Sequence, residues 1–186
     1  MFDSVVLRWD RPDIDLFAIS LNHKLETFVS PVLDPLAFAV DTMSLSWDGM
    51  FAYSFPPFRF FLQVLFKIKQ SDFKVILIAP AWPKQAWIPE LLLLSCAKPL
   101  KLPFRRDLLS QFNGKVVHPR PESLHLHAWL LSGSDYVRKA FLKEQPHTSQ
   151  SLSDSLQGSC MRPSGQSCVI GVVDGILIQS ESLSNS

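Results

Sequence analysis

The chain has 186 residues, of which 47% are hydrophobic, so it is long enough for one domain with a substantial core. Its 18 basic and 17 acidic residues give a net charge of +1, which excludes a strongly basic nucleic-acid coat protein and an acidic tail. The seven glycines form no G-x-G-x-x-G or G-x-x-x-x-G-K-[ST] phosphate loop. No stretch approaches the about 20 apolar residues of a membrane span. The three cysteines are widely spaced, which favours an intracellular compartment, cytoplasmic or nuclear.

The composition changes sharply near residue 131. Residues 1–131 contain 13 of the 14 Phe and all five Trp, whereas residues 132–186 contain 13 of the 23 Ser. We therefore predict a core-forming domain over residues 1–131, followed by a largely disordered linker over residues 132–186. Within the linker, residues 169–178 form an apolar run. This short run is too small to fold alone, so we expect it to be the edge of a larger unit.

The first half of the chain reads as short strands separated by prolines. Residues 14–18 and 27–30 are predicted as strands, and residues 35–43 are compatible with a helix. Residues 51–55 are again strand-like and end at a proline pair, which suits the turn that leaves a strand. Apolar residues then recur at spacings of three and four over residues 58–70, which predicts an amphipathic helix.

The middle of the chain predicts the sheet. Residues 75–79 are apolar on both faces, as in a central parallel strand, and residues 87–97 read as a second helix. Strand, helix, strand and helix in this order make a βαβ unit with a parallel sheet, so the predicted fold class is α/β. Beyond residue 98 the pattern weakens: residues 116–118 suggest a strand, and residues 123–131 a strand or short helix.

Ligands of such sheets bind beyond the carboxyl ends of the strands, where the sequence places three notable segments. One of them is Phe55-Pro56-Pro57-Phe58, between a strand and a helix. Amino-methyltransferases place an Asp/Asn-Pro-Pro-aromatic motif at such a point: the polar residue binds the amine and the aromatic ring stacks on the flipped base. The alternative is a rigid turn that packs two aromatic side chains into the core.

Other candidate groups also have two interpretations. Asp15 is a candidate for holding the amino group of a methionine-type cofactor, and Asp34 or Asp41 for binding its ribose or adenine; each is otherwise a solvated loop carboxylate. Trp82 and Trp87 either stack on bases or fill the core between sheet and helix.

Two further patterns are weaker indications of a functional site. His125 and His127 share one face of a strand, but two imidazoles without a third ligand do not make a metal site, so we expect no metal. The basic strip over residues 98–106 either contacts phosphates or is a solvated face.

Many dispersed residues resemble the polyprotein of DIRS-like retrotransposons, in the stretch between RNase H and the tyrosine recombinase. The resemblance covers nearly the whole chain and includes Asp15 to Ala18, Asn22 to Leu25, Ser30-Pro31, Asp34-Pro35, Ala39 to Asp41, Trp47, Ala52-Tyr53, Phe55 to Phe58, Val75 to Pro80, Trp82-Pro83, Gln85, Trp87, His127 to Trp129 and Gly165 to Ile178. It implies that residues 132–186 lead toward a recombinase domain.

That retrotransposon stretch is itself similar to phage-type N6-adenine DNA methyltransferases. The similarity implies a Rossmann-like, S-adenosylmethionine-dependent fold. It further implies that the cofactor is held by Asp15, Phe17, Ala18 and Asp41, that Phe55 to Phe58 form the catalytic motif, and that Trp82 and Trp87 contact substrate. Two departures matter: Phe55 replaces the polar residue, and the glycine usual near the first strand is missing.

The first hypothesis is therefore a degenerate, non-catalytic methyltransferase-like module with a structural or DNA-handling role in replication of the element. Its expected partners are DNA and the other domains of the polyprotein, and no membrane. The second hypothesis is an active DNA adenine-N6 methyltransferase that uses S-adenosylmethionine. The third is a remnant without selected function.

Overall fold

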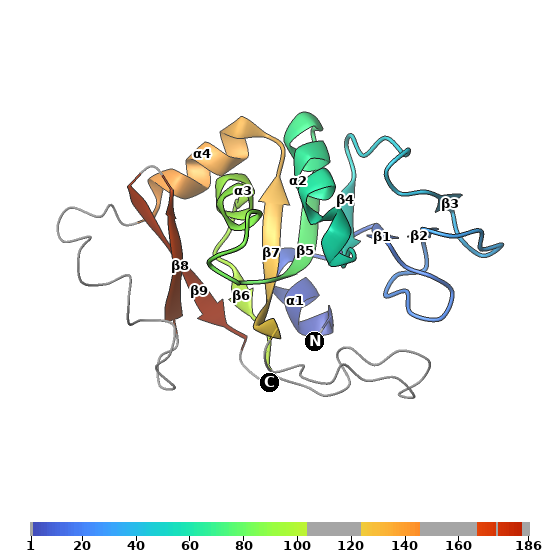
Figure 1. Cartoon of the computed structure of the whole chain (residues 1–186), viewed down its shortest axis with the longest axis horizontal. Helices are drawn as coiled ribbons and strands as arrows, with labels where there is room; N and C mark the ends of the chain where they lie inside the picture. Colours follow the sequence, from blue (N-terminus) through green and yellow to red (C-terminus); the bar gives the residue numbers. More distant parts are fainter. Residues whose placement is uncertain (1, 104–123, 146–166, 174, 184–186) are drawn as a thin grey trace.

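The structure, a computed structural model, describes residues 2–103, 124–145, 167–173 and 175–183, and it is built around one sheet (Figure 1). The sheet has nine strands in the order β3-β2-β1-β4-β5-β7-β6-β9-β8. The strands are β1 (Ile14–Leu16), β2 (Phe28–Ser30), β3 (Ala39–Val40), β4 (Phe51–Ser54), β5 (Lys74–Pro80), β6 (Leu100–Lys101), β7 (Leu126–Ser132), β8 (Ser167–Val173) and β9 (Ile176–Ser182).

Strands β1 to β5 pair in parallel with one another, whereas β7 is antiparallel to both β5 and β6. Beyond β6, β9 pairs in parallel and β8 closes the sheet as an antiparallel hairpin partner. The predicted fold class is thus confirmed at the level of an α/β fold with a mostly parallel sheet.

Helices cover both faces of the sheet. On one face lie α2 (Phe61–Gln70), α3 (Ile88–Leu94) and α4 (Asp135–Lys143), and on the other lies α1 (Phe2–Trp9) (Figure 1). Side chains of β5 alternate between the two cores: Val75, Leu77 and Ala79 face α2 and α3, whereas Ile76 and Ile78 lie in the cluster that contains α1. This period of two is why an uninterrupted apolar run can serve as a central strand.

Most predicted elements are confirmed, but residues 35–43 are not helical. They form turns and β3, because the Asp34 carboxylate accepts the Leu36 N–H at 3.1 Å and the Asp34 carbonyl accepts the Ala37 N–H at 3.1 Å. Such local bonds compete with helix formation. The helix predicted over residues 58–70 begins as a short 3-10 turn, η1 (Phe58–Phe60), and continues as α2. The sequence reasoning did not foresee α1.

Residues 132–186 differ from the expected linker wherever the structure describes them. They provide the last residue of β7, then α4 and the β8–β9 hairpin, so the predicted boundary at residue 131 falls inside a strand. The hairpin joins the sheet through β6, whose Leu100 and Lys101 pair with Glu181 and Ser182. A two-residue strand has no recognisable sequence pattern, which is why this partner was missed. Residues 116–118 and 146–166 lie outside the described residues.

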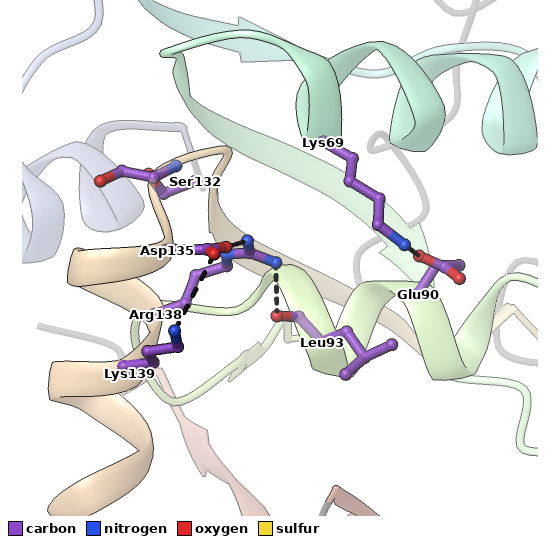
Figure 2. Close-up of polar contacts among 8 residues, drawn as sticks. Lys69, Glu90, Leu93, Ser132, Asp135, Arg138 and Lys139 are labelled. Carbon is purple, nitrogen blue, oxygen red and sulfur yellow. Dashed lines mark hydrogen bonds and ion pairs between the residues drawn. The ribbon is translucent and has the colours of Figure 1, made fainter.

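Two polar links, which Figure 2 shows, and a close approach at one glycine fix the helical layer. The Arg138 guanidinium pairs with Asp135 and donates to the Leu93 carbonyl at 3.4 Å, so α4 is tied to the last turn of α3. Lys69 on α2 and Glu90 on α3 form an ion pair at 3.5 Å. Gly133, between β7 and α4, lies so close to the end of α2 that an added Cβ would meet the Ser71 carbonyl oxygen at 1.8 Å.

Candidate functional site

The carboxyl edge of the parallel strands contains a topological switch point. Strand β1 pairs with β2 on one side and β4 on the other, and the chain builds outward in both directions from this pair. In open α/β sheets, ligands bind where the strand order reverses in this way. The segments that follow β1, β4 and β5, and the residues that precede the reversed β7, therefore lie at the edge of interest.

Four aromatic side chains meet where β4 and β5 end, and we call them the aromatic edge: Phe58, Phe61, Trp82 and Trp87. The Phe58 ring centroid lies 5.5 Å from those of Phe61 and Trp82. Trp87 lies 5.3 Å from Phe61 and 6.1 Å from Trp82. Phe61 is buried, but 42% of Phe58 remains exposed. The structure thus brings together three predicted site residues, Phe58, Trp82 and Trp87. Phe58 is the one with an exposed ring.

The first position of the Pro-Pro motif is a partly buried aromatic residue. Phe55 packs against the core cluster that contains α1, together with Tyr53 of the same strand. Pro56 is buried and Pro57 is exposed in an extended conformation (φ −57°, ψ 143°), which directs the chain into η1. Ser54 carries the nearest hydroxyl group along the chain, but it is fully buried and has no hydrogen-bond partner among the described residues. The motif therefore presents an aromatic ring but no exposed polar side chain to a ligand.

The residues after β1 close onto their neighbours. Phe17 has a left-handed backbone (φ 63°), and its ring lies 5.9 Å from that of Phe60. Ala18 is buried and donates its N–H to the Val29 carbonyl at 3.1 Å. The Arg59 guanidinium lies 4.8 Å above the Phe60 ring. Phe17, predicted for cofactor binding, therefore joins aromatic residues from the start of the helix that follows β4.

Asp15 is inside the molecule. Only 3% of it is exposed, and its Oδ2 accepts the Lys24 N–H at 2.7 Å from the loop after β1. Burial raises the pKa of Asp15 from 3.8 to about 7, although the Lys24 N–H bond and the charges of Lys24 and His23 oppose the shift. Tyr53 is its cross-strand neighbour, and burial together with the Asp15 charge raises the pKa of that phenol.

Asp34 and Asp41 instead lie in exposed turns. The Asp34 carboxylate accepts the N–H groups of Ser20 at 2.8 Å and Leu36 at 3.1 Å, and these bonds lower its pKa. Asp41 accepts the Ser44 hydroxyl and the Met43 N–H, which lower its pKa in the same way. Both groups are therefore charged at neutral pH, and each already stabilises a turn.

The two carboxylates predicted to hold S-adenosylmethionine lie on β1 and directly after β3. Asp15 is buried, and its carboxylate is bonded to the loop that contains Lys24. Asp41 is exposed, and β2 lies between its strand and β1. Of the two, only Asp41 presents an exposed carboxylate.

The charges near the aromatic edge are positive. Residues 49–89 contain five basic residues and a single acidic one, Asp72. Asp72 and Lys74 lie at the start of β5, the opposite end of that strand from Trp82, and Lys69 pairs with Glu90. Arg59 and Lys84 are exposed near the aromatic edge, and neither forms an ion pair with a described residue. Neither Arg59 nor Phe61 was singled out from the sequence, although both lie in the helix directly after the Pro-Pro motif.

The histidines and the basic strip have structural partners. His127 is buried, its Nδ1 lies 2.8 Å from the His125 carbonyl oxygen, and desolvation lowers its pKa to about 4. Within the described ranges no three His, Cys, Asp or Glu side chains gather as a metal site would require. Lys98 pairs with Glu181 at 3.6 Å, and residues 104–106 of the strip lie outside the described part.

Comparisons with family models, curated proteins and solved structures found no match to this chain. In the described residues, no helix has the length and apolar character that crossing a membrane requires. The functional argument therefore rests on the α/β fold, the aromatic edge and the charges around it.

Proposed function

We propose that this chain is a methyltransferase-like module of a DIRS-like retroelement polyprotein, and that it binds DNA bases at the aromatic edge without methylating them. The observation that carries the proposal is the combination at the end of β4: Phe58 is exposed beside Trp82, whereas Phe55, which stands in place of a polar residue, is partly buried against a core cluster. Such a site supplies stacking but no side-chain acceptor for an exocyclic amine.

The sheet order supports the methyltransferase-like part of the proposal. From β3 to β6 the order is β3-β2-β1-β4-β5-β7-β6, with only β7 reversed. An open α/β sheet whose order reverses at β1 is compatible with the Rossmann-like fold that the sequence similarity implies. The Pro-Pro motif follows β4, next to the switch point, as that similarity requires.

The local charge supports DNA as the partner. Arg59 and Lys84 are close in sequence to Phe58 and Trp82, and no acidic side chain occurs between residues 73 and 89. Exposed aromatic rings with adjacent cations are typical of sites that bind single-stranded nucleic acid. Each stacked base contributes about 1–3 kcal/mol to binding, so one exposed ring is enough to detect by substitution.

Binding of a fluorescent single-stranded DNA oligonucleotide to the full chain tests the proposal. Phe58→Ala is expected to weaken binding about tenfold, the lower part of the range for losing one stacked base. Phe66→Ala is the matched control, because Phe66 is an exposed phenylalanine of α2 far along the helix from the strand ends. Equal affinities of native protein and Phe58→Ala would refute base binding at this edge.

An assay for N6-methyladenine separates the two enzymatic alternatives. The native chain is expected to transfer no methyl group from S-adenosylmethionine to DNA, and calorimetry is expected to record no cofactor binding at high micromolar ligand. Methylation by the native chain would support the active enzyme instead. Activity gained in Phe55→Asn would identify a site that decayed by one substitution.

The retroelement part has its own test, which is the DNA that flanks the coding sequence. A reverse transcriptase reading frame upstream is expected. Its absence would remove the retroelement assignment and leave the DNA-binding proposal intact.

A further inference from the structure

Two adjacent stretches of the chain differ in the sign of their charge. Residues 26–48 contain four acidic residues, Glu26, Asp34, Asp41 and Asp48, and no Lys, Arg or His. The following stretch, residues 49–89, contains five bases and one acid. Asp34 and Asp41 lie in the turns that follow β2 and β3, at one end of the sheet, whereas Asp48 accepts the Asp72 N–H at 3.0 Å near the start of β5. Lys67 of α2 is the basic residue whose charge acts on Asp41.

The same end of the sheet exposes apolar side chains. We name as the acidic apolar edge the carboxylates of Asp34 and Asp41 together with the exposed side chains of Val32, Leu33, Leu36, Phe38 and Val40. The exposed fractions of these five apolar residues run from 45% at Val40 to 89% at Leu33. Five exposed apolar residues within nine positions exceed the scattered exposure expected of a surface and indicate an interaction site.

This edge is held in shape by hydrogen bonds. Asp34 fastens the turn through the N–H groups of Ser20 and Leu36, and the Phe38 N–H donates to the Phe28 carbonyl at 2.9 Å. The Asp41 N–H donates to the Ser30 carbonyl at 2.9 Å. The apolar side chains are therefore exposed on short turns that are already ordered, so binding a partner would cost little conformational entropy.

The outer side of β3 is also open in the described part of the chain. Strand β3 is the last strand at its end of the sheet, and only β2 pairs with it. Figure 1 shows β3 and its flanking turns at the end of the molecule opposite the β8–β9 hairpin, clear of α3 and α4. An open edge strand is a template to which an extended segment of another protein can add.

The negative charge of the acidic apolar edge indicates which kind of partner binds there. Carboxylates repel phosphates, so nucleic acid is disfavoured here, in contrast to the basic aromatic edge. A second copy that docked through the same surface would bring Asp34 and Asp41 against their own equivalents, which like-charge repulsion opposes. We propose that the acidic apolar edge is a docking surface for a basic protein segment in which apolar side chains alternate with Lys or Arg.

A binding assay with designed peptides tests this inference on the full chain. The probe is a fluorescent peptide of alternating Leu and Lys, and the comparison peptide alternates Leu and Glu. The triple variant Leu33→Ser/Leu36→Ser/Phe38→Ser removes exposed apolar contacts, so it is expected to fold normally and to weaken binding of the Leu–Lys peptide by about tenfold or more. The control Leu7→Ser/Phe66→Ser/Tyr136→Ser removes side chains of similar exposure elsewhere and is expected to bind as the native chain does.

Four results would overturn the inference. The edge variant would bind the Leu–Lys peptide as tightly as the native chain, or the Leu–Glu peptide would bind equally well. Sedimentation would show a native dimer that the edge variant loses, which would make a second copy the occupant. The edge variant would bind a DNA oligonucleotide more weakly than the native chain does, which would place nucleic acid at this edge. The DNA-binding proposal depends on Phe58, so the two proposals fail independently.

Discussion

The centre of the sheet and its β1–β3 side are stabilised in different ways. Strands β5 and β7 pair over seven residues and lie between two apolar cores. Strands β1, β2 and β3 have only two or three residues each, and carboxylates fasten the loops between them: Asp15 holds Lys24 and Asp34 holds Ser20. The comparison shows that one sheet can combine a region specified by packing with a region specified by polar contacts, and the polar region is the one with a charge-dependent stability.

The largest effect is expected at Asp15, the buried acid of the polar region. Asp15→Asn retains an acceptor for the Lys24 N–H and removes the ionisable group. A pKa raised from 3.8 to about 7 corresponds to at most about 4 kcal/mol, so the variant is expected to gain up to that much stability at pH 8.

The pH dependence of the stability follows from the raised pKa of Asp15. Below pH 3.8 both states are protonated and Asp15 costs nothing. As pH rises to about 7 the unfolded chain releases the proton first, so the native protein loses stability, and above that pH the loss is complete. Urea titrations at pH 5 and pH 8 measure this, and an Asn variant no more stable than the native chain at pH 8 would contradict it.

The second largest effect on the free energy of unfolding is expected in the packed region, at Gly133. A Cβ there would meet the Ser71 and Ile68 carbonyl oxygens at 1.8 and 2.3 Å, so Gly133→Ala must displace the end of α2. We expect a loss of about 3 kcal/mol, at the upper end of the usual cost of overpacking. Thermal unfolding measures it, and Gly49→Ala is the control. Nothing lies within 4 Å of the added Cβ at Gly49, so only its positive φ of 72° adds strain of about 1–2 kcal/mol.

A smaller effect is expected where the two regions meet, at Lys67. Its ammonium group donates to the Met43 carbonyl and lies 5.0 Å from the Trp47 ring centroid, so it ties the segment after β3 to α2. Lys67→Met keeps the aliphatic stem and is expected to cost about 1 kcal/mol. Hydrogen exchange of residues 42–48 is expected to accelerate while β5 stays protected; uniform acceleration would show that the two regions unfold together.

The smallest effect is expected at the ion pair of Lys69 and Glu90 on the helical layer. Both side chains are exposed by more than a third, so Glu90→Gln is expected to change the free energy of unfolding by less than about 0.5 kcal/mol. A larger change in a urea titration would mean that this surface pair specifies the packing of α2 on α3.

The two regions also differ in how far the sequence predicted them. The periodicity over residues 58–70 and the apolar run over residues 75–79 predicted α2 and β5, because long elements repeat their pattern several times. The turn after β2 was mistaken for a helix, because Asp34 and Pro35 act through local hydrogen bonds and not through periodicity. The helix α4 and the β8–β9 hairpin were not predicted, because they lie in a Ser-rich stretch. The strand with which the hairpin pairs, β6, has only two residues.

The candidate site shows the same division. The sequence by itself determined an α/β chain with a Pro-Pro motif after a strand, two tryptophans after the next strand, and a separation of acidic from basic stretches. Only the tertiary structure decided that Phe58, Trp82 and Trp87 meet, that Phe55 packs against a core cluster, and that Asp15 is buried under its own loop. The physical reason is that residue type and spacing specify strands and helices locally, whereas contacts between strand ends depend on which strands become neighbours in the sheet.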